Sequence, residues 1–261
     1  MRQTGMTVVL FAVLIYAGFC AFIYATQRNA IYYPTPEVDV PDVGDMRLDS
    51  DGETLKIWRL ELARGPNAII YFGGNAEDVA GNIPDFRNIF PRYDVYLANY
   101  RGYGGSTGSP SEAGLYKDAL AIFDEIRPRY TSISVIGRSL GSGVATYLAT
   151  ERNIDRLILV TPFDSIENVA RKALPILPVS LLLKDKFDSA GRVADIDGPV
   201  LIVIAENDEV ISRQHSDALA RAFPESQVTV EVIPDTGHNT IGMSPRYASV
   251  LSMFLAERAR Q

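Results

Sequence analysis

Short apolar segments rich in β-branched and aromatic residues alternate along the chain with longer segments of helical periodicity. The short segments predict strands at 55–60, 68–72, 95–98, 133–136, 157–160, 200–204 and 228–233. The longer segments predict helices at 76–90, 111–126, 140–150, 212–223 and 245–258. Several predicted strands are continuous apolar runs, as strands buried on both faces are. The pattern therefore predicts an α/β domain with a mostly parallel sheet flanked by helices, whose functional site lies at the carboxyl ends of the strands.

The N-terminal segment follows a different pattern. Residues 6–25 carry no charged side chain, and as a helix rising ~1.5 Å per residue they would cross the ~30 Å hydrocarbon core of a bilayer. We expect a single-pass membrane anchor. A cleaved signal peptide and a buried core helix are the alternatives, but cleavage after Ala25 would leave bulky Ile23 where a small residue is preferred. Arg2 and Arg28 flank the segment almost symmetrically, and the positive-inside rule favours a domain outside the cytoplasm only by a small margin.

A proline-rich stretch, YPTPEVDVP, marks the passage into the folded domain. Proline fixes φ and biases the preceding residue away from helix, so we expect an extended linker at 29–45 between an anchor at 1–28 and a domain at 46–261. The alternation of strands and helices lapses at 162–199. The apolar, proline-broken sequence LPILPVSLLL in this insertion predicts either a small cap over the site or a pair of short surface helices.

Composition and charge exclude several classes of function. The 261-residue chain has a formal net charge of −7 and no run of lysine or arginine, so it lacks the electropositive surface by which proteins bind nucleic acid. Its one cysteine, Cys20, cannot form an intrachain disulfide, and the sequence has no Cys/His cluster for structural zinc. With 47% hydrophobic and 22% charged residues, the composition is that of one globular domain and indicates no oligomeric state.

The segment VIGRSLGSGVA, residues 135–145, contains two overlapping glycine patterns. Gly137, Ser139 and Gly141 form a G-x-S-x-G, the strand-to-helix turn that exposes a nucleophilic serine. The same glycines together with Gly143 could instead form a phosphate-binding loop. The segment follows the β-rich SISVI and precedes a helix rich in small residues, as the serine turn requires, whereas the lysine and hydroxyl of a P-loop are missing. Ser139 is therefore the candidate nucleophile.

Only two histidines are present to activate the serine hydroxyl, and an unperturbed histidine pKa of ~6.5 suits a general base near neutrality. His215 lies in a predicted helix, where a surface or capping role is commoner. His238 lies in the loop PDTGHNT after the last predicted strand, where catalytic residues gather. The third member should be a carboxylate between serine and histidine in chain order. The loop after the strand VLIVIA offers Asp208, our choice, with Glu206 and Glu209 as alternatives.

Two backbone N–H groups are expected to form an oxyanion hole for the tetrahedral intermediate. One belongs to the residue after the nucleophile, Leu140. The other belongs to the loop YFGGNA that follows the strand at 68–72, where Asn75 is the expected donor. No metal or cofactor is implied by this set of residues.

With these residues in place, the chain resembles a membrane-anchored serine hydrolase of the α/β-hydrolase superfamily. The similar branch contains acyl-protein depalmitoylases, lysophospholipid and monoacylglycerol lipases, and serine-aminopeptidase-like proteins. The matching motifs are YFGGNAED, NYRGYGGSTGSPSE, GRSLGSG, AENDEVIS and TGHN. The resemblance implies the α/β-hydrolase fold and a triad of Ser139, Asp208 and His238. One departure is Gly73-Gly74, where the family often has His-Gly, and it leaves the oxyanion loop without a frequent side-chain support.

The expected reaction is acyl transfer to water. Ser139 would attack an ester or thioester carbonyl, and His238 would protonate the leaving group and then activate water. An anchor near acyl lipids or lipidated proteins favours a small-molecule or lipid substrate with a hydrophobic acyl group. A peptidase-like amidase and a non-catalytic scaffold are the alternatives. Arg138, beside the nucleophile, would bind an anionic headgroup or, as is commoner in such networks, a nearby carboxylate.

Overall fold

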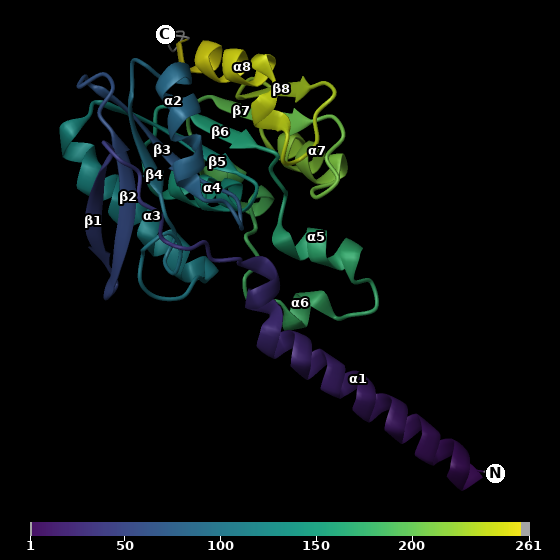
Figure 1. The fold of residues 1–261 in the computed structure, drawn as a ribbon. Helices are drawn as coiled ribbons and strands as arrows, with labels where there is room; N and C mark the ends of the chain where they lie inside the picture. Colours follow the sequence, from purple (N-terminus) through teal and green to yellow (C-terminus); the bar gives the residue numbers. More distant parts are fainter. Residues whose placement is uncertain (1, 257–261) are drawn as a thin grey trace.

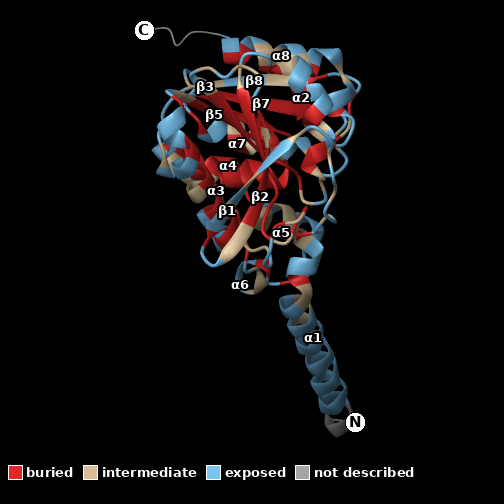
Figure 2. Ribbon diagram, turned by 60° about the vertical axis from the view of Figure 1, so that its left-hand side comes forward, coloured by how far each residue is buried: buried red, intermediate tan, exposed pale blue. Residues whose placement is uncertain are grey.

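A long apolar helix precedes the folded domain. The structure, a computed structural model, describes residues 2–256, with side chains described from Gly5 onward. Helix α1 (Arg2–Ile31) projects away from the rest of the chain (Figure 1). In its most apolar part the segment Gly5–Ile31 has a mean hydropathy of 2.5, and none of that part is buried. Figure 2 shows α1 exposed over most of its length, so by length and composition this helix is able to cross a membrane.

Within the described chain, eight strands form one sheet. They are β1 (Gly44–Ser50), β2 (Glu53–Leu60), β3 (Asn67–Phe72), β4 (Asp94–Ala98), β5 (Ser132–Arg138), β6 (Leu157–Val160), β7 (Val200–Ala205) and β8 (Val228–Ile233). Their order is β1-β2-β4-β3-β5-β6-β7-β8, antiparallel from β1 through β2 to β4 and parallel elsewhere. Phe72, the last residue of β3, pairs with Gly137 on β5. The oxyanion loop and the serine turn therefore begin side by side.

All the strands that the sequence predicts are present, and the sheet is mostly parallel as expected. Strand β1 is an addition that the pattern did not predict. It lies at the edge of the sheet with most of its residues exposed or half-buried, and its sequence GDMRLDS is mainly polar. An edge strand with little buried surface lacks the apolar signal by which strands are recognised.

Helices cover both faces of the sheet (Figure 1). One face carries α3 (Glu112–Ile126), α4 (Leu140–Glu151) and α7 (Arg213–Ala222), and the other carries α2 (Ile83–Ile89) and α8 (Pro245–Ala256). Short 3-10 turns are η1 (Val79–Asn82), η2 (Arg127–Arg129) and η4 (Ile241–Met243). The single helix predicted at 76–90 is instead η1 followed by α2, because Pro84 has no N–H to continue a preceding helix and sits in the first turn of α2. Residues 257 and 258 of the last predicted helix lie outside the described residues.

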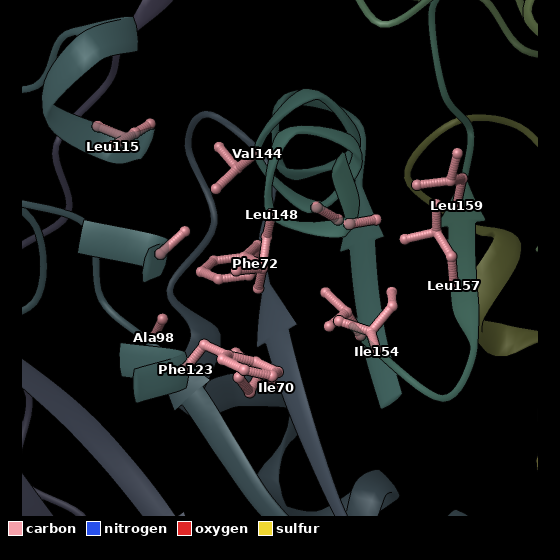
Figure 3. Close-up of a cluster of buried hydrophobic side chains, with 14 of the residues drawn as sticks. Ile70, Phe72, Ala98, Leu115, Phe123, Val144, Leu148, Ile154, Leu157 and Leu159 are labelled. Atoms are coloured by element: carbon pink, nitrogen blue, oxygen red, sulfur yellow. The ribbon is translucent and has the colours of Figure 1, made fainter. Parts of the chain in front are cut away.

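A buried apolar cluster fixes the strands that lead to the site. Ile70 and Phe72 of β3 point to the same face of the sheet and pack with Val144 and Leu148 of α4 (Figure 3). Phe123 of α3 closes the cluster from the side. Each such buried side chain contributes roughly 1.5–3 kcal/mol relative to an exposed one. The ends of β3 and β5 therefore rest on a tightly packed base.

The insertion at 162–199 forms α5 (Ile166–Ala173), α6 (Val179–Leu182) and the 3-10 turn η3 (Ala190–Asp195). Helices α5 and α6 lie beside the end of α1 that joins the domain (Figure 1). The Gln27 side chain of α1 donates to the carbonyl of Leu182 (2.9 Å) and accepts from the N–H of Lys184 (2.7 Å). Arg28 pairs with buried Asp185 at 2.8 Å. The insertion is thus joined to the apolar helix by polar contacts.

The segment predicted as a linker, 29–45, is bound along the domain. Its first residues belong to the last turn of α1, and its last residues belong to the start of β1. Between them, the side chain of Tyr32 is buried in the core, only 3% exposed. Glu37 accepts a hydrogen bond from Lys56 of β2 at 2.9 Å. These contacts hold α1 close to the carboxyl ends of the strands.

Candidate active site

The turn between β5 and α4 places Ser139 at the carboxyl end of β5. Ser139 has φ 50° and ψ −116°, a conformation that costs energy in an L residue. Its N–H donates to the carbonyl of Val160 on β6 (2.9 Å). A Cβ on Gly141 would collide with the carbonyl oxygen of Phe72, and one on Gly137 would collide with the carbonyl oxygen of Gly141. The glycines of this motif are therefore explained by the close approach of α4 to the sheet.

Ser139, His238 and Asp208 lie in one hydrogen-bonded chain. The Nε2 atom of His238 is 3.0 Å from Ser139 Oγ, and its Nδ1 atom is 2.9 Å and 3.0 Å from the two carboxylate oxygens of Asp208. The side chains of His238 and Asp208 are only 6% and 2% exposed, so the hydrogen bond between them is shielded from water and stronger than an exposed one. The spacing is that of a nucleophile, a base and a group that orients the base.

The loop after β7 orients the carboxylate of Asp208. One of its oxygens accepts the backbone N–H groups of Val210 (2.9 Å) and Ile211 (2.7 Å). The two alternatives, Glu206 and Glu209, bond instead to backbone N–H groups of the histidine loop. The backbone N–H of Asp235 donates to Glu206 (2.9 Å), and the backbone N–H of His238 donates to Glu209 (3.1 Å). The geometry therefore assigns the imidazole contact to Asp208.

The two expected oxyanion donors lie at the ends of adjacent strands. Leu140 is the first residue of α4, where an N–H has no acceptor within the helix. Among the described residues, the Asn75 N–H also meets no acceptor. The rest of Asn75 is held: its side chain donates to the Ile31 carbonyl (3.2 Å), and its carbonyl accepts from the Tyr33 N–H (3.1 Å) and the Tyr103 hydroxyl (2.6 Å). The loop is fixed while this one donor stays available.

Tyrosine and glutamate side chains support the oxyanion loop at Gly73-Gly74. The carbonyl of Gly73 accepts from the Tyr100 hydroxyl at 2.7 Å. The N–H of Gly74 donates to the carboxylate of Glu77 at 2.7 Å. A Cβ at Gly73 would lie 2.8 Å from Val79, so this position has little room for a side chain. The sequence reasoning did not identify Tyr100 or Glu77, although Glu77 stands in the quoted motif YFGGNAED.

An ion pair between Arg138 and Glu77 connects the loops of the site. The two groups are 2.7 Å apart and 18% and 11% exposed. Arg138 also donates to the carbonyl of His238 and to the side chain of Asn239, both at 3.1 Å. Burial raises the pKa of the Glu77 carboxyl, but the charge of Arg138 and the hydrogen bonds that Glu77 accepts outweigh it, so this pKa lies below its ordinary value. Of the two expectations for Arg138, the structure supports the ion pair.

His215 forms a second histidine–carboxylate pair. Its Nδ1 atom lies 2.7 Å from the carboxylate of Asp164, and the two residues are 5% and 7% exposed. The expectation of a surface or capping role for His215 was wrong, because α7 packs this side against the start of the insertion. The adjacent Ser216 hydroxyl donates to the carbonyl of Pro162 at 2.6 Å. One signal was available: Leu219 follows at the i+4 position on the same helix face.

The site offers a hydroxyl nucleophile, a base hydrogen-bonded to it, a carboxylate behind the base and two backbone donors. This is the set of groups used for acyl transfer. Across residues 2–256 no three His, Cys, Asp or Glu side chains are grouped so as to hold a metal ion.

Comparison with known proteins finds relatives by sequence and solved structures of similar fold. Residues 67–182 match a family described as the alpha/beta hydrolase fold. The uncharacterized protein Rv2307c of Mycobacterium tuberculosis is 32% identical over 254 residues, which cover 91% of the chain and 89% of that protein. Protein bem46 of Schizosaccharomyces pombe is 28% identical over 284 residues, covering 95% of each chain. The solved structure of the Pyrococcus furiosus esterase Pf2001 has a TM-score of 0.69 at 19% identity, over 85% of the chain and 98% of the esterase.

Proposed function

The chain belongs to the alpha/beta hydrolase family, and we propose that it is a serine hydrolase that cleaves a carboxylic ester or thioester. One observation carries the proposal: the unbroken hydrogen-bonded chain from Ser139 through His238 to Asp208, which starts at a strained strand-to-helix turn. In this fold, the nucleophilic serine has a strained backbone, is buried and is hydrogen-bonded to its general base.

In the first half of the proposed reaction, Ser139 Oγ attacks the carbonyl carbon of the substrate while Nε2 of His238 takes its proton. Asp208 stabilises the imidazolium that forms, because its carboxylate lies against the opposite ring nitrogen. The carbonyl oxygen becomes an oxyanion and accepts the N–H groups of Asn75 and Leu140. One such donor is worth roughly 3–4 kcal/mol of transition-state stabilisation.

The second half returns the site to its starting state. His238 gives its proton to the leaving alcohol or thiol, and the acyl group stays on Ser139 as an ester. Water then enters, and His238 removes a proton from it as it attacks the acyl carbon. Collapse of the second tetrahedral intermediate breaks the bond to Ser139, whose Oγ takes back the proton from His238, and releases the carboxylic acid. The same base and the same oxyanion donors serve both halves.

Helix α1 is proposed to anchor the enzyme in a membrane. Its apolar, exposed surface supports this assignment, since a soluble protein would bury such a helix. Anchoring places the site close to acyl lipids and to lipidated proteins, which supports a substrate with a hydrophobic acyl group. The name of the structural relative from Pyrococcus furiosus, an esterase, favours ester over amide cleavage.

Hydrolysis of p-nitrophenyl esters by the full chain in detergent tests the proposal. Ser139→Ala should reduce turnover to the uncatalysed background, and Asp208→Asn should lower kcat roughly 1,000- to 10,000-fold because the imidazolium loses its counter-charge. Ser249→Ala, an exposed serine on α8, is the matched control and should behave as wild type. Full activity in Ser139→Ala would refute the proposal, and wild-type cleavage of amides with no ester turnover would favour a peptidase.

A further inference from the structure

An apolar pocket of about 310 Å³ lies between α1 and the insertion. This volume is at the lower end of the roughly 300–1,000 Å³ found for small-molecule sites. Ile23 and Ala30 line it from α1, and Ala170 and Leu174 line it from the region of α5. Gln27 is a polar residue of the lining, but its amide is occupied by bonds to the backbone of the insertion. The pocket therefore offers an apolar surface to a ligand.

The pocket reaches the oxyanion loop at its inner end. Ile31 lines the pocket, and its carbonyl accepts the hydrogen bond from the Asn75 side chain at 3.2 Å. The N–H of Asn75 is one of the two donors assigned to the oxyanion. Ile166, at the start of α5, also lines the pocket and follows the loop after β6, the strand beside β5. The inner end of the pocket is therefore one hydrogen bond away from the loop that carries Asn75.

The insertion also follows α1 outward, into the apolar part of that helix. The Tyr16 hydroxyl donates to the carbonyl of Ile176, in the loop between α5 and α6, at 2.7 Å. Tyr16 lies nine residues before Ala25, the end of the uncharged stretch, which is roughly 14 Å along a helix. Ile176 and Leu181 are 74% and 84% exposed. If α1 spans a bilayer, the contact with Tyr16 places Ile176 in its hydrocarbon region.

Most backbone N–H groups of this loop are either paired or replaced by proline, which lowers the cost of a lipid environment, where each unpaired N–H or C=O is expensive. Pro175 and Pro178 have no N–H to satisfy. The N–H groups of Leu174, Leu177 and Val179 donate within the insertion at 2.8, 3.1 and 2.9 Å. The bond from Tyr16 satisfies a carbonyl in the same loop.

Charged groups gather where the apolar stretch of α1 ends. The Lys184 ammonium lies 4.0 Å from the centre of the Tyr24 ring, and the pair of Arg28 and Asp185 follows one turn later on the helix. Tyrosine and basic side chains are typical of the level of lipid headgroups. Ile23, the outermost residue of the lining on α1, directly precedes Tyr24, so the outer end of the pocket reaches this level.

We infer that this pocket holds the acyl chain of a substrate drawn directly from the bilayer, with the carbonyl carbon delivered to Ser139. The inference rests on the proposed function and goes beyond it by assigning the acyl-binding site and its route of entry. A chain that slides between α1 and the insertion stays in contact with apolar side chains throughout. On the alternative route through water each methylene would be exposed on the way, which would slow entry roughly fourfold per group.

Filling the pocket tests the assignment. Ala30→Trp on α1 and Ala170→Phe on α5 each place a bulky ring in the lining, and Asn29→Trp puts the same ring on an exposed position of α1 outside it. Turnover is measured with p-nitrophenyl esters from acetate to dodecanoate, using the full chain in detergent. In both pocket variants the ratio of dodecanoate to acetate turnover should fall at least about tenfold relative to wild type, so that shorter chains are preferred. Asn29→Trp should keep the wild-type profile.

An unchanged chain-length profile in pocket variants that retain acetate turnover would overturn the assignment. The two substitutions lie on different helices, so if one variant does not fold, the chain-length profile of the other still tests the assignment. If the wild-type chain turns over no ester, the proposed function itself is contradicted. This outcome differs from the one that contradicts only the pocket assignment.

The route from the bilayer needs its own measurement. The double variant Ile176→Lys/Leu181→Lys places one charge on the loop between α5 and α6 and one on an exposed position of α6, and neither residue contacts the site. With the protein reconstituted in phosphatidylcholine vesicles that contain a long-chain fluorogenic ester, this variant should turn over the embedded ester at least about fivefold more slowly than wild type. Its turnover of water-soluble p-nitrophenyl acetate should be unchanged. Equal turnover of the embedded ester by both proteins would overturn entry from the bilayer.

Discussion

Glu77 shows how a single side chain organises the site without reaching the substrate. One of its oxygens accepts from the Tyr71 hydroxyl (2.6 Å) and the Asn82 side chain (2.7 Å). The other accepts from the Gly74 N–H and from Arg138, both at 2.7 Å. Through Gly74 it holds the oxyanion loop, and through Arg138 it reaches the histidine loop. Glu77 is therefore a positioning residue for the two loops that carry Asn75 and His238.

Glu77→Gln should destabilise the protein by roughly 3 kcal/mol at neutral pH, because the largely buried Arg138 loses its counter-charge. The pKa of Glu77 is lowered in the folded state, so its contribution is present in full above the unfolded value of ~4.3 and is lost as the pH falls through the lower folded value. Urea unfolding in detergent from pH 7 to 3 should show the difference from wild type shrinking below about pH 4.3.

Glu125→Gln is the matched control, since Glu125 pairs with Arg129 on an exposed helix surface. It should change the free energy of unfolding by at most about 0.5 kcal/mol. A difference between Glu77→Gln and wild type that stays constant across the pH range would contradict the assigned ion pair.

Local context predicts some residues of the site and misses others. Ser139 and His238 could be predicted because each stands in a short segment whose neighbours show a strand end. Glu77 could not, because its role depends on Arg138, a partner 61 positions away that only the folded sheet brings near. The pairing of His215 was missed for the same reason, because its partner Asp164 lies 51 positions away; only its burial could have been inferred, from Leu219 on the same helix face.

At the scale of elements, the contact between α4 and β3 sets the position of the nucleophile. A Cβ on Gly141 would meet the backbone of Phe72 and Gly73, which cannot move aside as a flexible side chain could. The sequence predicted both elements, since β3 is a continuous apolar run and α4 begins with small residues. It did not predict β1, where few buried side chains mark the pattern. The split of the helix at 76–90 was also missed, although Pro84 marks it in the sequence.

Gly141→Ala should destabilise the protein by about 3 kcal/mol or more, because the added methyl overpacks a junction made of backbone atoms. Turnover should fall with it, since any shift of α4 moves Ser139 and Leu140. Gly242→Ala is the control: a Cβ there meets nothing within 4 Å, and its effect should stay within about 0.5 kcal/mol. Equal unfolding midpoints for the two variants in urea would show that the approach of α4 is not tight.

At the scale of the whole molecule, an apolar helix and an insertion 150 residues later in the chain form one unit. Gln27 and Arg28 of α1 bond to Leu182 and Asp185, at separations of 155 and 157 residues. Hydropathy could predict the helix, but not this contact, because nothing in the local sequence of either segment indicates the other. The division into anchor, linker and domain at 28 and 45 therefore omitted contacts that join all three parts.

The full chain should remain with the membrane pellet after extraction in alkaline carbonate, and its mass should show an uncut N-terminus. Leu14→Arg/Ile15→Arg should release protein into the supernatant, because each arginine at the centre of a spanning helix costs roughly 2.5–3.5 kcal/mol. Wild-type protein in the supernatant would contradict the anchor, and a mass that lacks residues 1–25 would identify the segment as a cleaved signal peptide.

The central claim is that Ser139 is a nucleophile activated by His238 and Asp208. Labelling with a fluorophosphonate probe, followed by mapping of the modified peptide, tests it most directly, because the probe reacts only with a serine whose hydroxyl is activated. The wild-type chain and Ser249→Ala should carry the probe on the peptide that contains Ser139, and Ser139→Ala should carry none. An unlabelled wild type, or equal labelling of Ser139→Ala, would contradict the account.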